Sequence, residues 1–212
     1  MGFNFNQPYG YLRILHAIPQ VDSYDCYLND KLYAKDLLFE DFTPYKPISA
    51  GEHQIALCKH KSTESLLTHS LWISPGKIYT LLLTYQPAKE SIEYYLLNDP
   101  PRKMLEDHLL LRVAPFCQID SPFEIHLADT KPIFKKLKLC QPSPYLAFTA
   151  STYTLELFDI NTQKVLLNRE NCLLKTYRYY TLYLLGGTKA FPLRFVLTID
   201  GNSFLSFPDI TY

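Results

Sequence analysis

The sequence predicts an all-β protein made of two tandem immunoglobulin-like Greek-key β-sandwiches, and three observations support this fold class. Polar and apolar residues alternate in short runs, such as residues 12–16, 55–59 and 79–83, which are broken by Pro, Gly or Asn-Asp. No stretch keeps an uninterrupted 3.6-residue apolar period over several helical turns. The composition, with 17 Tyr, 13 Phe and 15 Pro but only 7 Gly, favours short strands joined by stiff connections.

The chain also contains an internal duplication. Four landmarks of the first half recur in the same order in the second half, at offsets of 99 to 101 residues. The pairs are Leu12-Arg13-Ile14 with Leu111-Arg112-Val113, Pro44-Tyr45 with Pro144-Tyr145, Tyr79-Thr80-Leu81 with Tyr180-Thr181-Leu182, and Asp99 with Asp200. Each copy then spans about 90 residues with about seven strand signals, the number expected of a Greek-key sandwich.

These landmarks set the expected domain boundaries. We expect an N-terminal tail over residues 1–8, a first module over 9–99, a stiff linker over 100–105 that begins with two prolines, and a second module over 106–212. Asp200-Gly201 is a tight-turn dipeptide, so it predicts a C-terminal hairpin whose last strand covers residues 203–207.

The net charge and the composition of the first residues indicate which partners and which cellular location to expect. The 21 Lys and Arg balance the 21 Asp and Glu, which disfavours nucleic acid as a partner. Residues 1–10 have neither the basic nor the apolar stretch of a secretory signal, and no apolar run approaches the roughly 18 residues of a membrane span. We therefore expect a cytoplasmic protein without membrane insertion. The alternative is a cell or spore surface reached by a non-classical route.

Several segments carry a family resemblance. They are His16-Ala17-Ile18-Pro19 followed by residues 25–32, Phe42-Thr43-Pro44-Tyr45 leading to Ala50-Gly51, residues 75–80, and residues 193–203. Together they resemble the bacterial domain of unknown function 4397, whose members often carry such modules in tandem. The second module departs from the pattern at Pro115 and Ser151, where the family has His and Gly. The resemblance implies an immunoglobulin-like sandwich and supplies no catalytic residues.

Catalytic signatures are missing from the sequence. It contains no Gly-x-Ser-x-Gly elbow, no His-Glu-x-x-His and no glycine-rich phosphate loop. We expect no enzyme, no catalytic residue and no cofactor. The leading hypothesis is a non-enzymatic binding or assembly protein that holds a protein partner or a surface polymer. The alternative is a carbohydrate-binding or adhesion protein of the cell or spore surface.

The five cysteines indicate packing more than chemistry. Their number is odd and no Cys-x-x-Cys occurs, which argues against a disulfide framework or a zinc knuckle. Four of them align with apolar residues of the other copy: Cys26 with Ile125, Cys58 with Phe158, Cys117 with Ile18 and Cys172 with Leu71. A reduced cysteine packs as a small hydrophobic residue, so we expect these four to lie in the cores.

Two groups of residues could bind metal ions. His53, Cys58, His60 and His69 surround one predicted hairpin, where a transition-metal site competes with exposed strand and turn residues. Asp22 and Asp25 precede the second strand of the first module, and Asp120 and Glu124 precede that of the second. Two carboxylates are too few for a calcium site, so turn chemistry is favoured and we expect no metal.

The two halves differ in charge. Residues 1–99 hold 8 basic and 11 acidic side chains, whereas residues 100–212 hold 13 and 10. The contrast is concentrated at equivalent positions, with Asp36, Glu40 and Asp41 in the first module against Lys135, Lys136 and Lys138 in the second. Unlike patches would attract, either docking the modules or joining chains head to tail. Ordinary variation of a solvated surface is the other explanation.

The tyrosines fall into two sets. Tyr45 and Tyr145 occupy the same place in both copies and predict a buried tie resembling the tyrosine corner of β-sandwiches. Other tyrosines exceed what a core requires and are candidates for stacking on sugars or partner side chains, namely Tyr94, Tyr95, Tyr179 and Tyr183. Burial of these rings between modules is the alternative.

Overall fold

The computed structural model describes residues 8–62, 64–99, 106–128 and 132–207. The chain divides into two compact units, one of residues 1–100 with 205–212 and the other of residues 101–204. The predicted linker over residues 100–105 lies outside the described residues, as does the predicted tail apart from Pro8.

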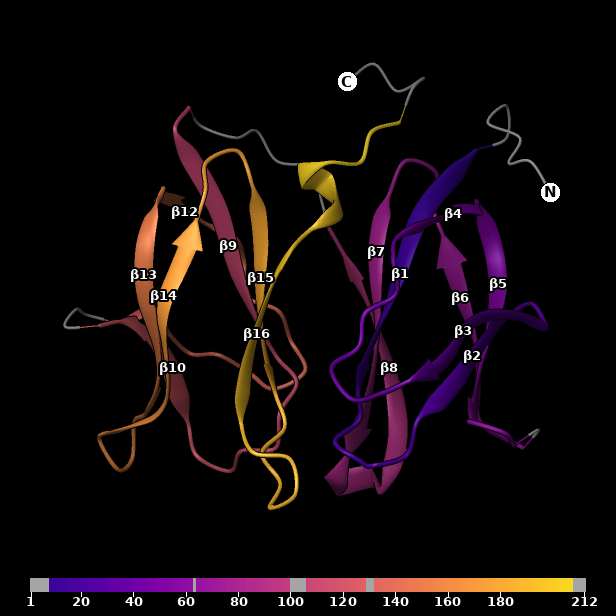
Figure 1. Ribbon diagram of the computed structural model, residues 1–212, viewed down its shortest axis with the longest axis horizontal. Coiled ribbons are helices and arrows are strands. Elements are labelled where there is room, and N and C mark those ends of the chain that lie inside the picture. The colour runs from indigo at the N-terminus through magenta and orange to yellow at the C-terminus, as the bar shows by residue number, and fades with distance from the viewer. Residues whose placement is uncertain (1–7, 63, 100–105, 129–131, 208–212) are drawn as a thin grey trace. The chain divides into compact units, whose positions relative to one another are not determined.

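The first module is a sandwich of two four-stranded sheets (Figure 1). One sheet has the order β4-β1-β7-β8, made of β4 (Lys46–Ser49), β1 (Tyr9–Ala17), β7 (Ile78–Gln86) and β8 (Ser91–Asn98). The other has the order β3-β2-β5-β6, made of β3 (Lys31–Leu37), β2 (Tyr24–Leu28), β5 (Gly51–Lys59) and β6 (Ser65–Ile73). A short 3-10 helix, η1 (Pro87–Lys89), joins β7 to β8.

The second module repeats this topology strand by strand. Its first sheet has the order β12-β9-β15-β16, made of β12 (Leu146–Thr149), β9 (His108–Pro115), β15 (Tyr179–Leu185) and β16 (Arg194–Ile199). Its second sheet has the order β11-β10-β13-β14, made of β11 (Pro132–Phe134), β10 (Phe123–Leu127), β13 (Ser151–Asp159) and β14 (Lys164–Leu174). The prediction of two tandem all-β sandwiches is therefore confirmed.

Strand pairing differs in detail from an immunoglobulin constant domain, where seven strands divide four and three between the sheets. Within the described residues each module has eight strands divided equally, and its first and seventh strands run parallel, β1 with β7 and β9 with β15. All other strand pairs within the sheets are antiparallel.

Each module closes its own core through the two-residue period of its strands. Leu12 and Ile14 of β1 face inward together with Leu81 and Leu83 of β7, and Ile55 of β5 approaches from the facing sheet. Full burial of one such side chain contributes about 1.5–3 kcal/mol, so these rows hold the two sheets together. The second module repeats the arrangement with a core of its own, which includes Leu111, Val113, Leu155, Leu182 and Leu184.

A tight turn joins β2 to β3. Asn29 and Asp30 have φ values of 49° and 60°, the left-handed pair that a type I′ hairpin requires. Asn29 is tied to β5, since its backbone N–H donates to the carbonyl of Gln54 and its side-chain oxygen accepts from the N–H of Gln54. These two hydrogen bonds fix the turn to β5.

The predicted C-terminal strand over residues 203–207 does not form, so this prediction is wrong. After Asp200 the chain enters a 3-10 helix, η2 (Gly201–Ser203), in which the N–H of Ser203 donates to the carbonyl of Asp200. Phe207 then packs with its ring centroid 5.5 Å from that of Tyr9 and 5.2 Å from that of Tyr11. Among the described residues, 205–207 group with the first compact unit, whereas the sequence predicted them in the second module. No helix within the described ranges is long and apolar enough to cross a membrane.

Candidate functional site

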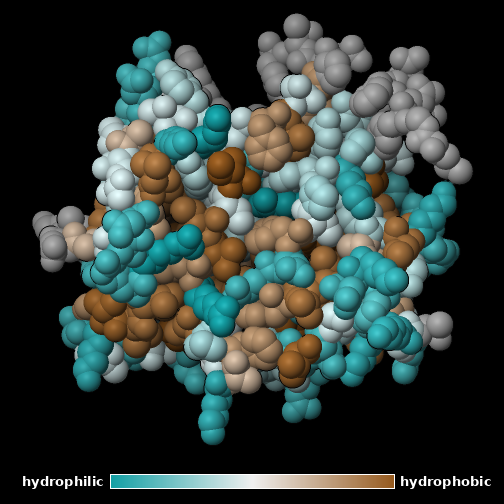
Figure 2. All heavy atoms as spheres, viewed as in Figure 1, coloured by the Kyte–Doolittle hydropathy of each residue, from teal (hydrophilic) through white to brown (hydrophobic). Residues whose placement is uncertain are grey.

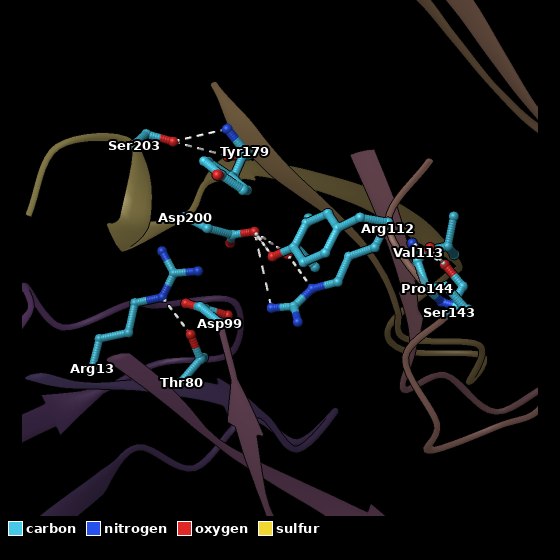
Figure 3. Close-up of polar contacts among 12 residues, drawn as sticks. Arg13, Thr80, Asp99, Arg112, Val113, Ser143, Pro144, Tyr179, Asp200 and Ser203 are labelled. Carbon is cyan, nitrogen blue, oxygen red and sulfur yellow. Dashed lines mark hydrogen bonds and ion pairs between the residues drawn. The ribbon is translucent and has the colours of Figure 1, made fainter. Parts of the chain in front are cut away.

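A buried polar network lies on the β4-β1-β7-β8 sheet of the first module. The Nε of Arg13 donates to the hydroxyl of Thr80 at 2.8 Å, a contact visible in Figure 3, and the Tyr45 hydroxyl donates to Asp99 at 3.1 Å. The Arg13 guanidinium also stacks 4.6 Å above the Tyr45 ring and 4.9 Å from that of Phe42. Arg13, Thr80 and Asp99 are all buried.

The same network recurs in the second module. The Nε of Arg112 donates to Thr181 at 2.8 Å, and the Thr181 hydroxyl in turn donates to Asp200 at 2.6 Å. Asp200 also accepts from Tyr145 at 2.7 Å and lies 3.9 Å from the Arg112 guanidinium, which is directed at it in Figure 3. The Arg112 guanidinium lies 4.7 Å from the centre of the Tyr145 ring.

Each landmark of the sequence repeat contributes one member to each network: Arg13, Tyr45, Thr80 and Asp99 in the first, and their counterparts in the second. The predicted hydrogen-bonded tie forms at both Tyr45 and Tyr145, but its partner is an Asp side chain and not backbone. Tyr145 is buried as predicted, whereas Tyr45 is half-buried. Buried charges persist only when they are paired and hydrogen-bonded. These networks therefore join strands of the first sheet in each module.

An open groove of about 360 Å³ lies on the outward face of the β3-β2-β5-β6 sheet of the first module. Its lining comprises Tyr27 on β2, Gln54, Ala56 and Cys58 on β5, and Ser65 and Thr68 on β6. Asp30 of the tight turn and Ser62 between β5 and β6 also line it. Since the neighbouring Cys26, Ile55 and Leu57 face the core, strand alternation directs the lining residues outward.

The groove arises from a small residue flanked by larger ones. Ala56 lies opposite Tyr27 on one side and Thr68 on the other. The equivalent position in the second module is Glu156, which lies between His126 and Asn168. The sheet surface is therefore hollow at Ala56, whereas a long side chain occupies the corresponding place in the second module.

Trp72 lies on the same outward face, opposite Glu52, and is 62% exposed. It is the only tryptophan of the chain. Sequence reasoning missed both Trp72 and the groove, although one signal was present. Leu71 and Ile73 are apolar, so alternation alone directs Trp72 away from the core.

The first module, with its groove, matches a known protein family. A family model described as a domain of unknown function, DUF4397, matches residues 10–116. The chain belongs to this family. The DUF4397 match covers nearly all of the first module, including the groove and Trp72, and extends through β9 of the second. No curated protein matches the sequence.

In this DUF4397 chain, the histidines around the predicted hairpin do not converge. His53 contacts Asn29 at 2.8 Å and the carbonyl of Ser49 at 2.7 Å, His60 lies 2.9 Å from Asp25, and His69 packs against Tyr94. Across the described ranges, no group of three or more His, Cys, Asp or Glu residues is placed to hold a metal ion.

The carboxylates considered as cation ligands contact basic side chains. Asp22 forms an ion pair with Lys59 at 2.9 Å, and Glu124 lies 2.9 Å from His126. Burial alone would raise the pKa of Asp25, but hydrogen bonds from the Asp36 N–H and from His60 outweigh it and hold this pKa below its usual value. Asp120 is exposed.

All five cysteines are free, and four are buried. Cys26, Cys117 and Cys172 lie in the cores, as predicted, whereas Cys58 lies on the outward face and lines the groove. Burial raises the pKa of Cys26 and of Cys117 to about 12, and it raises the pKa of Cys58 and of Cys172. Since the thiolate is the reactive form, these four thiols are poor nucleophiles at neutral pH. Cys140 is half-buried.

The four tyrosines proposed for stacking differ in how far their side chains are exposed to solvent. Tyr179 and Tyr183 are buried, which keeps their rings from an external ligand in this structure. Tyr94 and Tyr95 are half-buried, and their hydroxyls contact His69 at 3.3 Å and Gln86 at 2.9 Å respectively. Ligand stacking on Tyr94 and Tyr95 stays a prediction.

The charged residues of the predicted partner surface lie at equivalent places in the two modules, around the connection from the third strand to the fourth. Lys135, Lys136 and Lys138 are exposed. On the acidic side, Asp36 accepts from Ser23 at 2.5 Å and Asp41 accepts from the N–H of Leu38 at 2.8 Å, while Glu40 is half-buried. Attraction between these loops stays a prediction.

Figure 2 shows that apolar side chains also gather on the surface of the second module, where Val165, Leu166 and Leu173 are exposed.

Proposed function

We propose that this protein is a non-catalytic binding protein whose ligand lies on the outward face of the β3-β2-β5-β6 sheet in the first module. The observation that carries the proposal is the groove of about 360 Å³ whose lining includes Ala56. Its volume lies in the range typical of small-molecule sites. The wall residues of β2, β5 and β6 belong to paired strands, so the groove exists before any ligand arrives.

The chemistry of the groove favours holding a ligand over transforming it. Its one thiol, Cys58, is buried with a raised pKa, and no histidine is among the lining residues. His60, the histidine nearest to Cys58 along the chain, contacts Asp25, and His53, beside Gln54, contacts the carbonyl of Ser49. A nucleophile needs an adjacent base to be activated, and the lining provides no such pair.

The second module supports a site confined to the first. At the positions equivalent to Cys58 and Tyr27 it has Phe158 and His126, whose rings stack 4.6 Å apart. His126 is further fixed by its contact with Glu124. Side chains that pack on one another in this way leave less room for a ligand at that sheet.

The test is affinity capture with the immobilised full chain, applied to soluble and envelope extracts of the source organism. The variant is Ala56→Glu, which introduces the side chain that the second module already accommodates as Glu156. We expect Ala56→Glu to lose the captured molecule while circular dichroism stays unchanged. The matched control, Glu156→Ala, should capture as the wild type does.

The captured molecule should also be released with its mass unchanged after prolonged contact, as expected for binding without turnover. Equal capture by wild type and Ala56→Glu would show that another surface binds. Conversion of the captured molecule would show that the protein is an enzyme.

A further inference from the structure

We infer that the ligand of this face is a neutral oligosaccharide, which lies along β5 and β6 with sugar rings stacked on Trp72 and Tyr27. The inference rests on the proposed binding function and assigns its ligand class. Strand register places the contributing residues in rows: Glu52 opposite Trp72, Gln54 opposite Ser70, and Ala56 between Thr68 and Tyr27.

The aromatic residues provide the apolar contacts. A pyranose ring has an apolar face of C–H groups and a rim of hydroxyls, so it suits an indole or phenol ring that is accessible from solvent. Trp72 is 62% exposed, and it takes part in no ring contact among the described residues. Tyr27 is half-buried beside the hollow at Ala56, where a ring could enter.

The polar residues between the two rings match sugar hydroxyls. Gln54 has both an amide donor and a carbonyl acceptor, and the hydroxyls of Ser65 and Thr68 can donate and accept. These two hydroxyls already contact each other at 2.8 Å, which fixes their direction. The hydroxyl of Ser70 lies in the row between Thr68 and Trp72.

The charges of this face argue against an anionic ligand. Among the described residues, the lining of the groove contains the carboxylate of Asp30 and no cationic side chain, and Glu52 adds a second carboxylate on the same face. Phosphates, nucleic acids and uronic-acid polymers would be repelled by this arrangement. A neutral glycan carries no such penalty.

The spacing of the aromatic residues indicates an oligomer. Thr68 and Trp72 are four residues apart on one strand, which corresponds to about 13 Å. Tyr27 lies a further two strands across the sheet from Trp72. One sugar ring cannot reach both aromatic side chains, whereas a linear chain of several sugars can.

The single tryptophan makes this inference directly measurable. Fluorescence of Trp72 in the full chain is titrated with neutral hexasaccharides of β-1,4-glucose, α-1,4-glucose, β-1,4-mannose, β-1,4-xylose and β-1,4-N-acetylglucosamine. A hexauronate serves as the charged comparison. We expect a saturable change with at least one neutral hexasaccharide and none with the hexauronate.

Variants locate the contact. Tyr27→Ala should weaken the binding of the active hexasaccharide about tenfold, as expected when one stacked ring is lost. Trp72→Ala, followed by calorimetry, should weaken it at least as much. Leu173→Ala, at the position of the second module that matches Trp72, should leave the affinity unchanged.

Each failure has a distinct meaning. No saturable change with any neutral hexasaccharide, or equal binding of the hexauronate, would overturn the glycan assignment. The proposed binding function would survive that result if Ala56→Glu still abolished capture from extracts. A captured protein that depends on Trp72 and Ala56 would replace the glycan by a protein partner. Capture insensitive to Ala56→Glu would remove both proposals.

Discussion

The two modules share a framework and differ in one outer surface. Both have the same strand order and the same Arg-Thr-Asp-Tyr network. They differ on the outward face of the second sheet, where Ala56 and Cys58 of the first module correspond to Glu156 and Phe158 of the second. Residues that specify the fold are thus duplicated, while the proposed ligand surface is particular to one copy. This division is expected when function is carried by sites placed on a common fold.

The largest predicted effect tests the shared framework. Replacing Asp200 by Ala removes the carboxylate that lies beside Arg112 and accepts from Tyr145 and Thr181, so this variant should lose about 3–5 kcal/mol of unfolding free energy. Replacing Asp99 by Ala removes the acceptor of the Tyr45 hydroxyl and should lose about 1–3 kcal/mol. Urea unfolding followed by circular dichroism measures this loss, and Trp72 fluorescence reports on the first module.

Asp120→Ala provides the control, because this exposed carboxylate should change stability by no more than about 0.5 kcal/mol. If Asp99→Ala and Asp200→Ala were as stable as this control, the networks would not be the framework that the modules share.

The second prediction distinguishes the modules by pH. His16 is fully buried, with its ring centroid 5.0 Å from that of Tyr24, and its position in the second module is Pro115. Burial lowers the pKa of His16 to about 4, despite opposing contributions from a backbone hydrogen bond and from Asp41. Because the unfolded chain binds this proton more readily, the first module should lose stability as pH falls from about 6.5 to 4. The loss should be about 3 kcal/mol, from 1.36 kcal/mol per pKa unit.

Unfolding followed by Trp72 fluorescence at pH 7, 5.5 and 4 measures this loss. In His16→Leu the free energy of unfolding should fall much less between pH 7 and 4 than in the wild type. The substitution should change this free energy less at pH 7 than at pH 4. An unchanged slope in His16→Leu would assign the acid sensitivity to other groups.

The smallest predicted effect concerns thiol reactivity. The first module has only Cys26 and Cys58, both buried with raised pKa values, whereas the second has the half-buried Cys140. Under native conditions, iodoacetamide should label Cys140 first and leave the other four unmodified, as peptide mass spectrometry would show. Labelling in denaturant should reach all five. Early labelling of Cys58 would mean that this thiol, which lines the groove, is more accessible to solvent than the structure indicates.

Much of the architecture was predictable because it depends on local patterns. Alternation located most strands, and the repeat of Arg13, Tyr45, Thr80 and Asp99 at fixed offsets revealed the duplication. The C-terminal strand was mispredicted because Asp200-Gly201 suits both a hairpin turn and the start of a 3-10 helix. In the structure the 3-10 helix is held by Ser203, which accepts from the N–H of Tyr179, and Phe207 packs on Tyr9 and Tyr11 nearly 200 residues away in sequence.

The candidate site was less predictable than the fold. The histidine cluster near Cys58 was compact in sequence, yet its members turn to separate partners. The groove depends on which side chains lie across neighbouring strands from Ala56, and strand register is not written in any one segment.

The amino-acid sequence by itself determined the fold class, the duplication and the direction of Trp72, because these follow from the two-residue period of strands and from repeated residues. Only the tertiary structure decided that four repeated landmarks meet in one buried network, and that Tyr27, Ala56 and Thr68 adjoin to form a groove. The physical reason is that such contacts join strands far apart in the chain, so they exist only once the sheets have paired and closed on their cores.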